Sequence, residues 1–157
     1  MGMSGGQSFT ICAAVRESPP PASMRQRFTF DQTEPNKNFH KKRLGKIGET
    51  LACEYLLNHQ YTLIERNFQK RYGELDIIAV KDKTLIFVEV KTRIGRRFGL
   101  PEESVTPRKL REVIQTAHYY KLLHPELPER LQIDVIAIEL ETDETLKAFR
   151  HIENVTS

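Results

Sequence analysis

The feature that most constrains the fold is a pair of strand-like segments in the middle of the chain, residues 73–80 and 85–91. Both segments are rich in β-branched residues and alternate with a period of two, which predicts two β-strands. The polar residues 81–84 between them predict a short turn, so the two strands should form an antiparallel hairpin. A turn of two or four residues would place Ile78 opposite Phe87.

The same register brings charged side chains together at the open end of the hairpin. Asp76 is expected to oppose Glu89, and Glu74 to oppose Lys91. Directly opposed residues have Cβ atoms roughly 4.5–5.5 Å apart, and like charges at that distance are destabilising. The carboxylates of Asp76 and Glu89 therefore need a compensating cation, which is either a divalent metal ion or the ammonium group of Lys91.

Length and composition set loose limits on the class of protein. The chain has 157 residues, which suits one domain, and its 39% hydrophobic and 29% charged residues are those of a soluble globular protein. Cys12 and Cys53 form neither a metal-binding spacing nor a disulfide framework, and no apolar run is long enough to span a membrane. We therefore expect a cytoplasmic protein with no membrane partner. The net charge of +3 is too small to indicate nucleic-acid binding by itself.

The chain divides into a tail and one domain. Residues 1–40 are rich in Gly, Ser and Pro and show no sustained period, which predicts a disordered extension. Residues 41–157 alternate between helical and strand patterns, which predicts an α/β domain with a central mixed five-stranded sheet flanked by helices. The expected helices are 42–58 and 106–124, and the other expected strands are 61–68, 131–140 and, at the sheet edge, 147–155.

Two basic segments flank the hairpin in sequence. The first segment, residues 36–47, contains no acidic residue, and three of its cations lie in the first expected helix. The second is the loop after the hairpin, which carries three arginines and no acidic residue. Solvated faces and contacts to nucleic-acid phosphates both account for such segments. The candidate phosphate-binding residues are Lys42, Arg43, Lys46, Arg93, Arg96 and Arg97.

The charged end of the hairpin has the residue types of a divalent-metal site. Mg²⁺ prefers oxygen ligands and usually takes one or two carboxylates from the protein, together with water and phosphate. Asp76 and Glu89 supply two carboxylates, and the backbone carbonyl of Val90 could add a third oxygen. Lys91 could orient or deprotonate a water molecule or neutralise a phosphate. Glu49, at the border of the apolar stripe of the first helix, is either a further ligand or a solvated helix residue.

These residues resemble a known family. Residues 73–76 (Gly-Glu-Leu-Asp) followed by residues 87–93 (Phe-Val-Glu-Val-Lys-Thr-Arg) resemble the signature of the YraN family of bacterial proteins. That family is similar to the PD-(D/E)XK nuclease superfamily, which includes archaeal Holliday-junction resolvases. The resemblance covers roughly residues 42–155 and implies a restriction endonuclease-like fold. It implies that the metal and catalytic residues are Glu49, Asp76, Glu89 and Lys91.

The second helix adds a further resemblance. Gln115 and Tyr119 are similar to a Gln-x-x-x-Tyr motif of some nuclease branches, which implies a catalytic role for Gln115 and a nucleic-acid contact for Tyr119. The chain departs from the family at residues 132–133, where Gln-Ile stands in place of an Arg-Phe pair. Its long N-terminal segment is a second departure.

The leading functional hypothesis is a metal-dependent endonuclease that uses Mg²⁺ or Mn²⁺ to hydrolyse DNA, including branched DNA. By analogy with resolvases, such an enzyme would be a homodimer, associating through the second helix or the last strand. The alternatives are a nucleic-acid-binding module without cleavage activity and an assembly factor whose carboxylates serve stability alone. The intact set of Asp76, Glu89 and Lys91 favours the enzyme, because a binding module gains nothing from opposed carboxylates facing phosphate.

Overall fold

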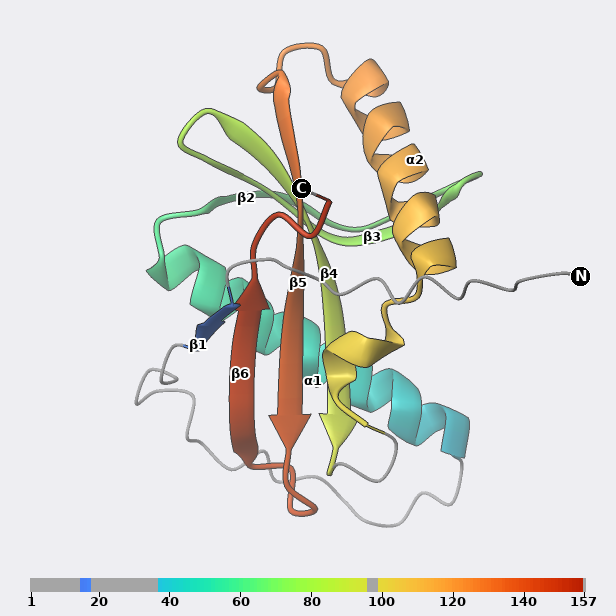
Figure 1. Ribbon diagram of the computed structural model, residues 1–157, viewed down its shortest axis with the longest axis vertical. Helices are drawn as coiled ribbons and strands as arrows, with labels where there is room; N and C mark the ends of the chain where they lie inside the picture. Colours follow the sequence, from blue (N-terminus) through green and yellow to red (C-terminus); the bar gives the residue numbers. More distant parts are fainter. Residues whose placement is uncertain (1–14, 18–36, 96–98, 157) are drawn as a thin grey trace, which may run out of the picture.

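The computed structural model describes residues 15–17, 37–95 and 99–156, which form one mixed β-sheet with a long helix on each side (Figure 1). The strands lie in the order β1-β6-β5-β4-β3-β2. The elements along the chain are β1 (Val15–Glu17), α1 (Lys37–Asn58), β2 (Thr62–Lys70), β3 (Gly73–Lys81), β4 (Thr84–Ile94), the 3₁₀-helix η2 (Pro101–Ser104), α2 (Pro107–Leu123), β5 (Arg130–Leu140) and β6 (Leu146–Ile152).

The predicted hairpin is present, with the predicted register. Ile78 pairs with Phe87 in the antiparallel ladder between β3 and β4. The turn between the strands consists of Asp82 and Lys83, which both have positive φ angles, of 48° and 58°. Two consecutive residues of that conformation give the turn type whose twist matches the flanking strands. This turn geometry fixes which side chains of the two strands share a face.

The fold class is confirmed. Strands β4 and β5 are parallel and are joined by the crossover through α2, whereas the other neighbouring strands are antiparallel. The sheet is therefore mixed, as expected for the restriction endonuclease-like α/β fold. Neither of the helices α1 and α2 in the described part of the chain is long and apolar enough to cross a membrane.

The N-terminal edge of the sheet corrects two predictions. The five predicted strands are joined by a sixth, β1, which lies within the segment expected to be a disordered extension and pairs antiparallel with β6. The last strand is therefore not the sheet edge. Helix α1 begins at Lys37, earlier than predicted. The rest of the expected extension, residues 1–14 and 18–36, lies outside the described residues.

Helix α1 packs tightly on one face of the sheet. An ideal Cβ atom at Gly48 would lie 1.8 Å from Oγ1 and 3.0 Å from Cβ of Thr92, so a side chain at Gly48 would require Thr92 or the helix to shift. The side chains of Ile77 and Ala79 belong to the core cluster on this face, and those of Ile78 and Phe87 belong to the cluster beneath α2. Both faces of the hairpin are thus buried near the turn, which makes it a rigid support for the charged residues at its open end.

Candidate active site

The site begins where β3 and β4 separate. The ladder between the two strands ends at the pair Ile77–Val88. Beyond it, the backbone N–H of Val90 donates a hydrogen bond to Oδ2 of Asp76, at 2.7 Å. A side-chain carboxylate thus takes the place of a strand carbonyl, and this holds Asp76 against β4.

Glu89 lies beside Asp76 and is buried, with 2% of its surface exposed. Its Oε1 atom lies 2.5 Å from Nζ of Lys91 and 3.6 Å from Nζ of Lys109. Its Oε2 atom is buried and has no hydrogen-bond partner in the described part of the chain. An unsatisfied buried carboxylate oxygen costs free energy unless a ligand reaches it.

Asp76 holds a proton more tightly than an ordinary aspartate. The pKa of its carboxyl group is raised from 3.8 to about 7, mainly by burial and next by the negative charge of Glu89. The hydrogen bond from Val90 and the charge of Lys91 act in the opposite direction, and Glu49 adds a smaller increase. The negative charges of Glu89 and Glu49 therefore disfavour ionisation of Asp76.

The other two carboxylates near the site have basic partners of their own. Glu49, on α1, lies 3.7 Å from a guanidinium nitrogen of Arg66 on β2. Glu74 lies 3.8 Å from Nζ of Lys109. The predicted backbone pairs Asp76–Glu89 and Glu74–Lys91 are absent from the β3–β4 ladder, which ends at Ile77–Val88.

The residue types at the site are those of a minimal magnesium site. No group of three or more His, Cys, Asp or Glu side chains among the described residues converges closely enough to hold a metal ion by itself. Two carboxylates are nevertheless the usual protein contribution to a Mg²⁺ site, with water and substrate phosphate as the remaining ligands. Asp76 and the free Oε2 atom of Glu89 meet this requirement. The carbonyl of Val90 and the carboxylate of Glu49 stay predicted ligands.

Lys109 is a member of the site that was not among the predicted residues. It lies in the first turn of α2, which begins after the N-cap Thr106, whose hydroxyl accepts a hydrogen bond from the Lys109 N–H at 3.2 Å. The helix dipole disfavours a cation at this position unless an anion is near. That conflict is visible in the sequence, but only the fold shows that the anions are Glu89 and Glu74.

The predicted phosphate-binding residues are distributed over several parts of the fold. Lys42 and Lys46 are exposed on α1. Arg43 forms an ion pair with Glu144, between β5 and β6, so its charge is already balanced within the protein. Arg93, on β4, donates to the carbonyl of Gly99 at 3.4 Å. Two further predicted residues, Arg96 and Arg97, lie outside the described residues.

No hydrogen bond joins Gln115 to the carboxylates among the residues that the structure describes. Gln115 is exposed on the flank of α2, whereas the α2 residue that contacts Glu89 is Lys109. Tyr119 lies one turn beyond Gln115 and packs edge-to-face on Tyr72, with 5.4 Å between the ring centroids. The predicted catalytic role of Gln115 therefore lacks support from a contact with the carboxylates.

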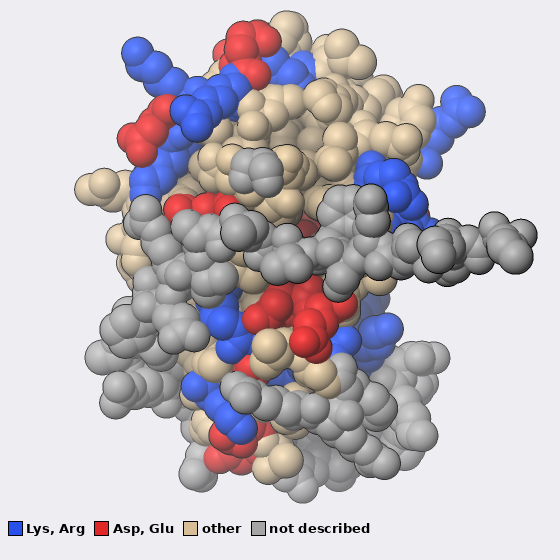
Figure 2. All heavy atoms as spheres, viewed as in Figure 1, with Lys and Arg blue, Asp and Glu red and all other residues tan. Residues whose placement is uncertain are grey.

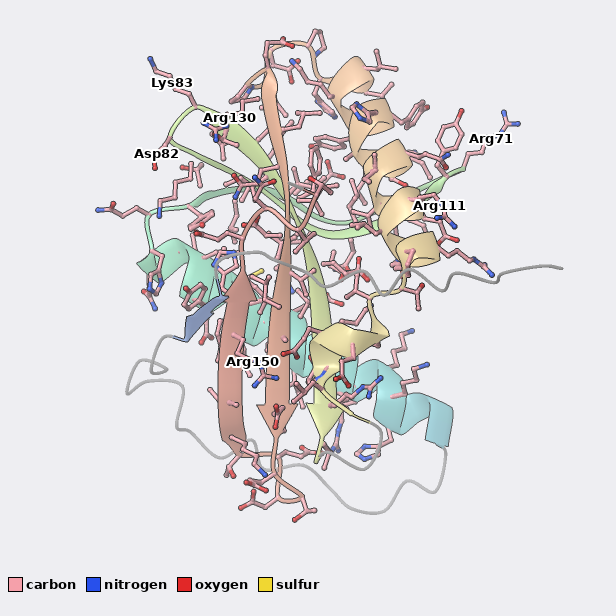
Figure 3. The ribbon with its side chains drawn as sticks, in the orientation of Figure 1. Arg71, Asp82, Lys83, Arg111, Arg130 and Arg150 are labelled. Atoms are coloured by element: carbon pink, nitrogen blue, oxygen red, sulfur yellow. The ribbon has the colours of Figure 1, made fainter. Side chains whose placement is uncertain are left out.

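An ion-pair network fixes the segment that leads from β4 to α2. Arg150, on β6, donates to Oε1 of Glu139 at 2.7 Å and to Glu102 of η2 at 2.8 and 2.9 Å. Figure 2 shows acidic side chains gathered over β5 and η2, with Lys and Arg side chains on both sides of them. Arg150 lies between β6 and β5 (Figure 3). This network anchors η2 a few residues before Lys109.

Comparison with known proteins identifies the family. The family described as "Uncharacterised protein family UPF0102" matches residues 48–138. A UPF0102 protein of Syntrophomonas wolfei is 46% identical over 100 residues, which are 64% of this chain and 87% of that protein. A UPF0102 protein of Clostridium botulinum is 38% identical over 120 residues, which are 74% of this chain and 96% of that protein.

One solved structure, titled "The structure of Pyrococcus Furiosus SfsA in complex with Ca2+", is 18% identical. It covers 69% of this chain and 62% of its own, with a TM-score of 0.36, too low to inform on function. The match over residues 48–138 includes the whole hairpin and the carboxylates of the candidate site. The chain therefore belongs to the UPF0102 family, which is the YraN family that the hairpin signature resembles.

Proposed function

We propose that this protein is a metal-dependent endonuclease that hydrolyses phosphodiester bonds in nucleic acid, with DNA as the expected substrate. The observation that supports this most is the buried, unpartnered Oε2 atom of Glu89 next to the proton-retaining carboxyl group of Asp76. A site built for stability alone would have satisfied that oxygen with a hydrogen-bond donor.

In this proposal, Asp76 and Glu89 hold a Mg²⁺ or Mn²⁺ ion. When bound, such an ion lowers the pKa of water and stabilises negative charge on phosphoryl oxygens. Asp76 has to release its proton to become a ligand, so binding should strengthen as the pH rises through about 7. In the same proposal Glu49, which lies 3.7 Å from Arg66 and acts electrostatically on Asp76, orients a water molecule of the site.

The lysines supply the charge that the phosphate needs. Lys91 contacts Glu89 through Nζ, and 27% of its side chain is exposed, so its ammonium group lies at the boundary between the carboxylates and solvent. There it can orient the attacking water or neutralise the scissile phosphate. Lys109 approaches the same carboxylate from α2, and thereby brings a second cation to the site.

The test is cleavage of a panel of duplex, branched and single-stranded DNA and RNA with Mg²⁺ or Mn²⁺. The wild type should cut at least one member, and Lys91→Ala should lose this activity. Lys83→Ala is the matched control, because Lys83 lies on the same hairpin but at the exposed tip of the turn (Figure 3). Activity in Lys91→Ala equal to that of wild type, or no cleavage by any wild-type sample, would favour a binding or assembly protein instead.

A homodimer and a cytoplasmic location are further parts of this proposal. A symmetric pair of sites would let the enzyme cut two strands. Because β1 pairs with β6, the more accessible surface for association is the end of α2, where Leu122 and Leu123 expose 79% and 47% of their area. Sedimentation velocity with and without DNA tests this, and monomers under both conditions would refute it.

A further inference from the structure

We propose that the outer flank of α2 and the turn before β3 form a surface that binds an unpaired nucleic-acid strand by stacking its bases on tyrosine rings. This inference rests on the proposed function and adds the substrate class: nucleic acid with a single-stranded segment near the cleavage site. We call this region the tyrosine surface. It consists of Arg71, Tyr72, Arg111, Gln115 and Tyr119.

Of the two aromatic rings, that of Tyr72 lies at the surface and that of Tyr119 is partly buried against the core cluster beneath α2. Tyr72 exposes 44% of its area in the turn between β2 and β3. Tyr119 is half-buried, and its ring meets that of Tyr72 edge-to-face at 5.4 Å between centroids. The exposed part of Tyr72 offers ring surface on which a nucleobase can stack.

The surroundings of the rings are positively charged. The guanidinium carbon of Arg71 lies 6.0 Å from the centroid of the Tyr72 ring. Arg71 and Arg111 project from the turn and from α2 on the same side of the molecule (Figure 3). Within the described part of the chain, neither arginine forms an ion pair. Arginines beside an exposed aromatic ring suit a ligand that carries both phosphates and π faces.

The tyrosine surface is held at a fixed distance from the carboxylates. The start of β3 packs on α2, since an ideal Cβ at Gly73 would lie 3.2 Å from Oγ1 of Thr116. From Tyr72, just before β3, to Asp76 the chain makes four residue steps, which span about 13 Å. At about 3.4 Å per stacked nucleotide, this corresponds to about four nucleotides between the stacked base and the site.

An unpaired strand fits this surface better than a duplex does. In a duplex the π faces of the bases are covered by their neighbours, and only phosphates and groove edges are accessible. In a single strand, each base can stack on an aromatic side chain, and such contacts tolerate any sequence. The substrate class that follows is DNA with a single-stranded end, flap or branch within about four nucleotides of the scissile bond.

The test is equilibrium binding in EDTA, where no cleavage takes place, by fluorescence anisotropy of labelled oligothymidylate and of a DNA hairpin duplex. Tyr72→Ala and Tyr119→Ala should each weaken binding of the single strand at least about fivefold, since a stacked base contributes about 1–3 kcal/mol. Binding of the duplex should change little. Tyr72→Phe keeps the ring and should bind like wild type. Oligouridylate in place of oligothymidylate separates RNA from DNA.

A second arm tests the arginines. Arg71→Ala and Arg111→Ala should each reduce the slope of log affinity against log salt by about 1, because each removes one phosphate contact. Arg130→Ala is the matched control, since Arg130 is an exposed arginine at the start of β5, away from the tyrosine surface (Figure 3). Thermal unfolding of each variant shows whether a loss of binding reflects a loss of structure.

The inference is overturned if the wild type does not bind the single strand, if the tyrosine-to-alanine variants of folded protein bind it like wild type, or if they lose duplex binding equally. Its failure differs from a failure of the proposed function. Single-strand binding that depends on Tyr72 but occurs without any cleavage would retain the tyrosine surface and reject the endonuclease. Cleavage that depends on Asp76 but not on Tyr72 would retain the endonuclease and reject the tyrosine surface.

Discussion

The metal-free protein should become less stable as the pH rises from 5 to 8. Replacing Asp76 by asparagine should remove a large part of this pH dependence. In the folded protein the pKa of Asp76 is raised from 3.8 to about 7. An unfolded chain releases this proton near pH 4, whereas the folded protein keeps it until about pH 7. The unfolded state therefore binds fewer protons in this interval, and the free energy of unfolding falls as the pH rises.

The magnitude follows from the width of this interval. One pH unit corresponds to about 1.4 kcal/mol, so the whole shift of about 3 units corresponds to about 4 kcal/mol. The part between pH 5 and pH 7 is about 3 kcal/mol, which for a chain of this length changes the unfolding temperature by roughly 6 to 12 °C. Asparagine cannot ionise, yet its side-chain oxygen can still accept the hydrogen bond from the N–H of Val90.

The assay is thermal unfolding followed by circular dichroism in EDTA at pH 5 and pH 8. Between pH 5 and pH 8 the free energy of unfolding should fall in the wild type and in Asp82→Asn. This fall should be about 3 kcal/mol larger than the fall in Asp76→Asn. Asp82→Asn is a fitting control because Asp82 is exposed at the turn of the same hairpin and loses the same charge. Equal losses in Asp76→Asn and wild type would refute the inference that Asp76 stays protonated to about pH 7.

Two further predictions concern the packing of α1 and the role of Lys109. Gly48→Ala should destabilise the protein by about 1–3 kcal/mol, because a Cβ atom there would meet Oγ1 of Thr92 at 1.8 Å. Gly45 has open space around it, so Gly45→Ala should stabilise the protein by up to about 1 kcal/mol. Chemical denaturation measures both, and similar effects of the two substitutions would contradict the close approach of α1 to β4. Lys109→Gln should raise the affinity for Mn²⁺ about three- to tenfold, because it removes a cation that lies 3.6 Å from Glu89. Isothermal titration of this variant beside Arg108→Gln measures the effect, and an unchanged affinity with a lowered unfolding temperature would show that Lys109 is only structural.

The sequence was sufficient to predict the part of the fold that depends on local patterns. The register of the hairpin follows from alternation and turn length, and the start of α2 follows from Thr106 as N-cap before a proline. The pairing of Asp76 with the N–H of Val90 was not predictable, because it depends on how the strands diverge after Ile77.

The other features that the sequence did not predict depend on contacts between residues distant in the chain. Arg43 is occupied by Glu144, which is 101 residues away, and this pairing needs the turn between β5 and β6 to lie near α1. The strand β1 has only three residues, which are too few to show a periodic pattern in the sequence. Gln115 has the spacing of a known motif, but it is exposed on α2, and the α2 residue that contacts Glu89 is Lys109.

The most direct test of the central claim is calorimetric titration of Mn²⁺ into the wild type, Asp76→Asn and Asp82→Asn at pH 8. At this pH the carboxyl group of Asp76 is largely ionised, because its pKa is about 7. The wild type and Asp82→Asn should bind one Mn²⁺ ion with the same affinity, and Asp76→Asn should bind it at least about tenfold more weakly because a charged ligand is lost. Equal binding of Mn²⁺ by wild type and Asp76→Asn would contradict the assignment of Asp76 and Glu89 as a metal site.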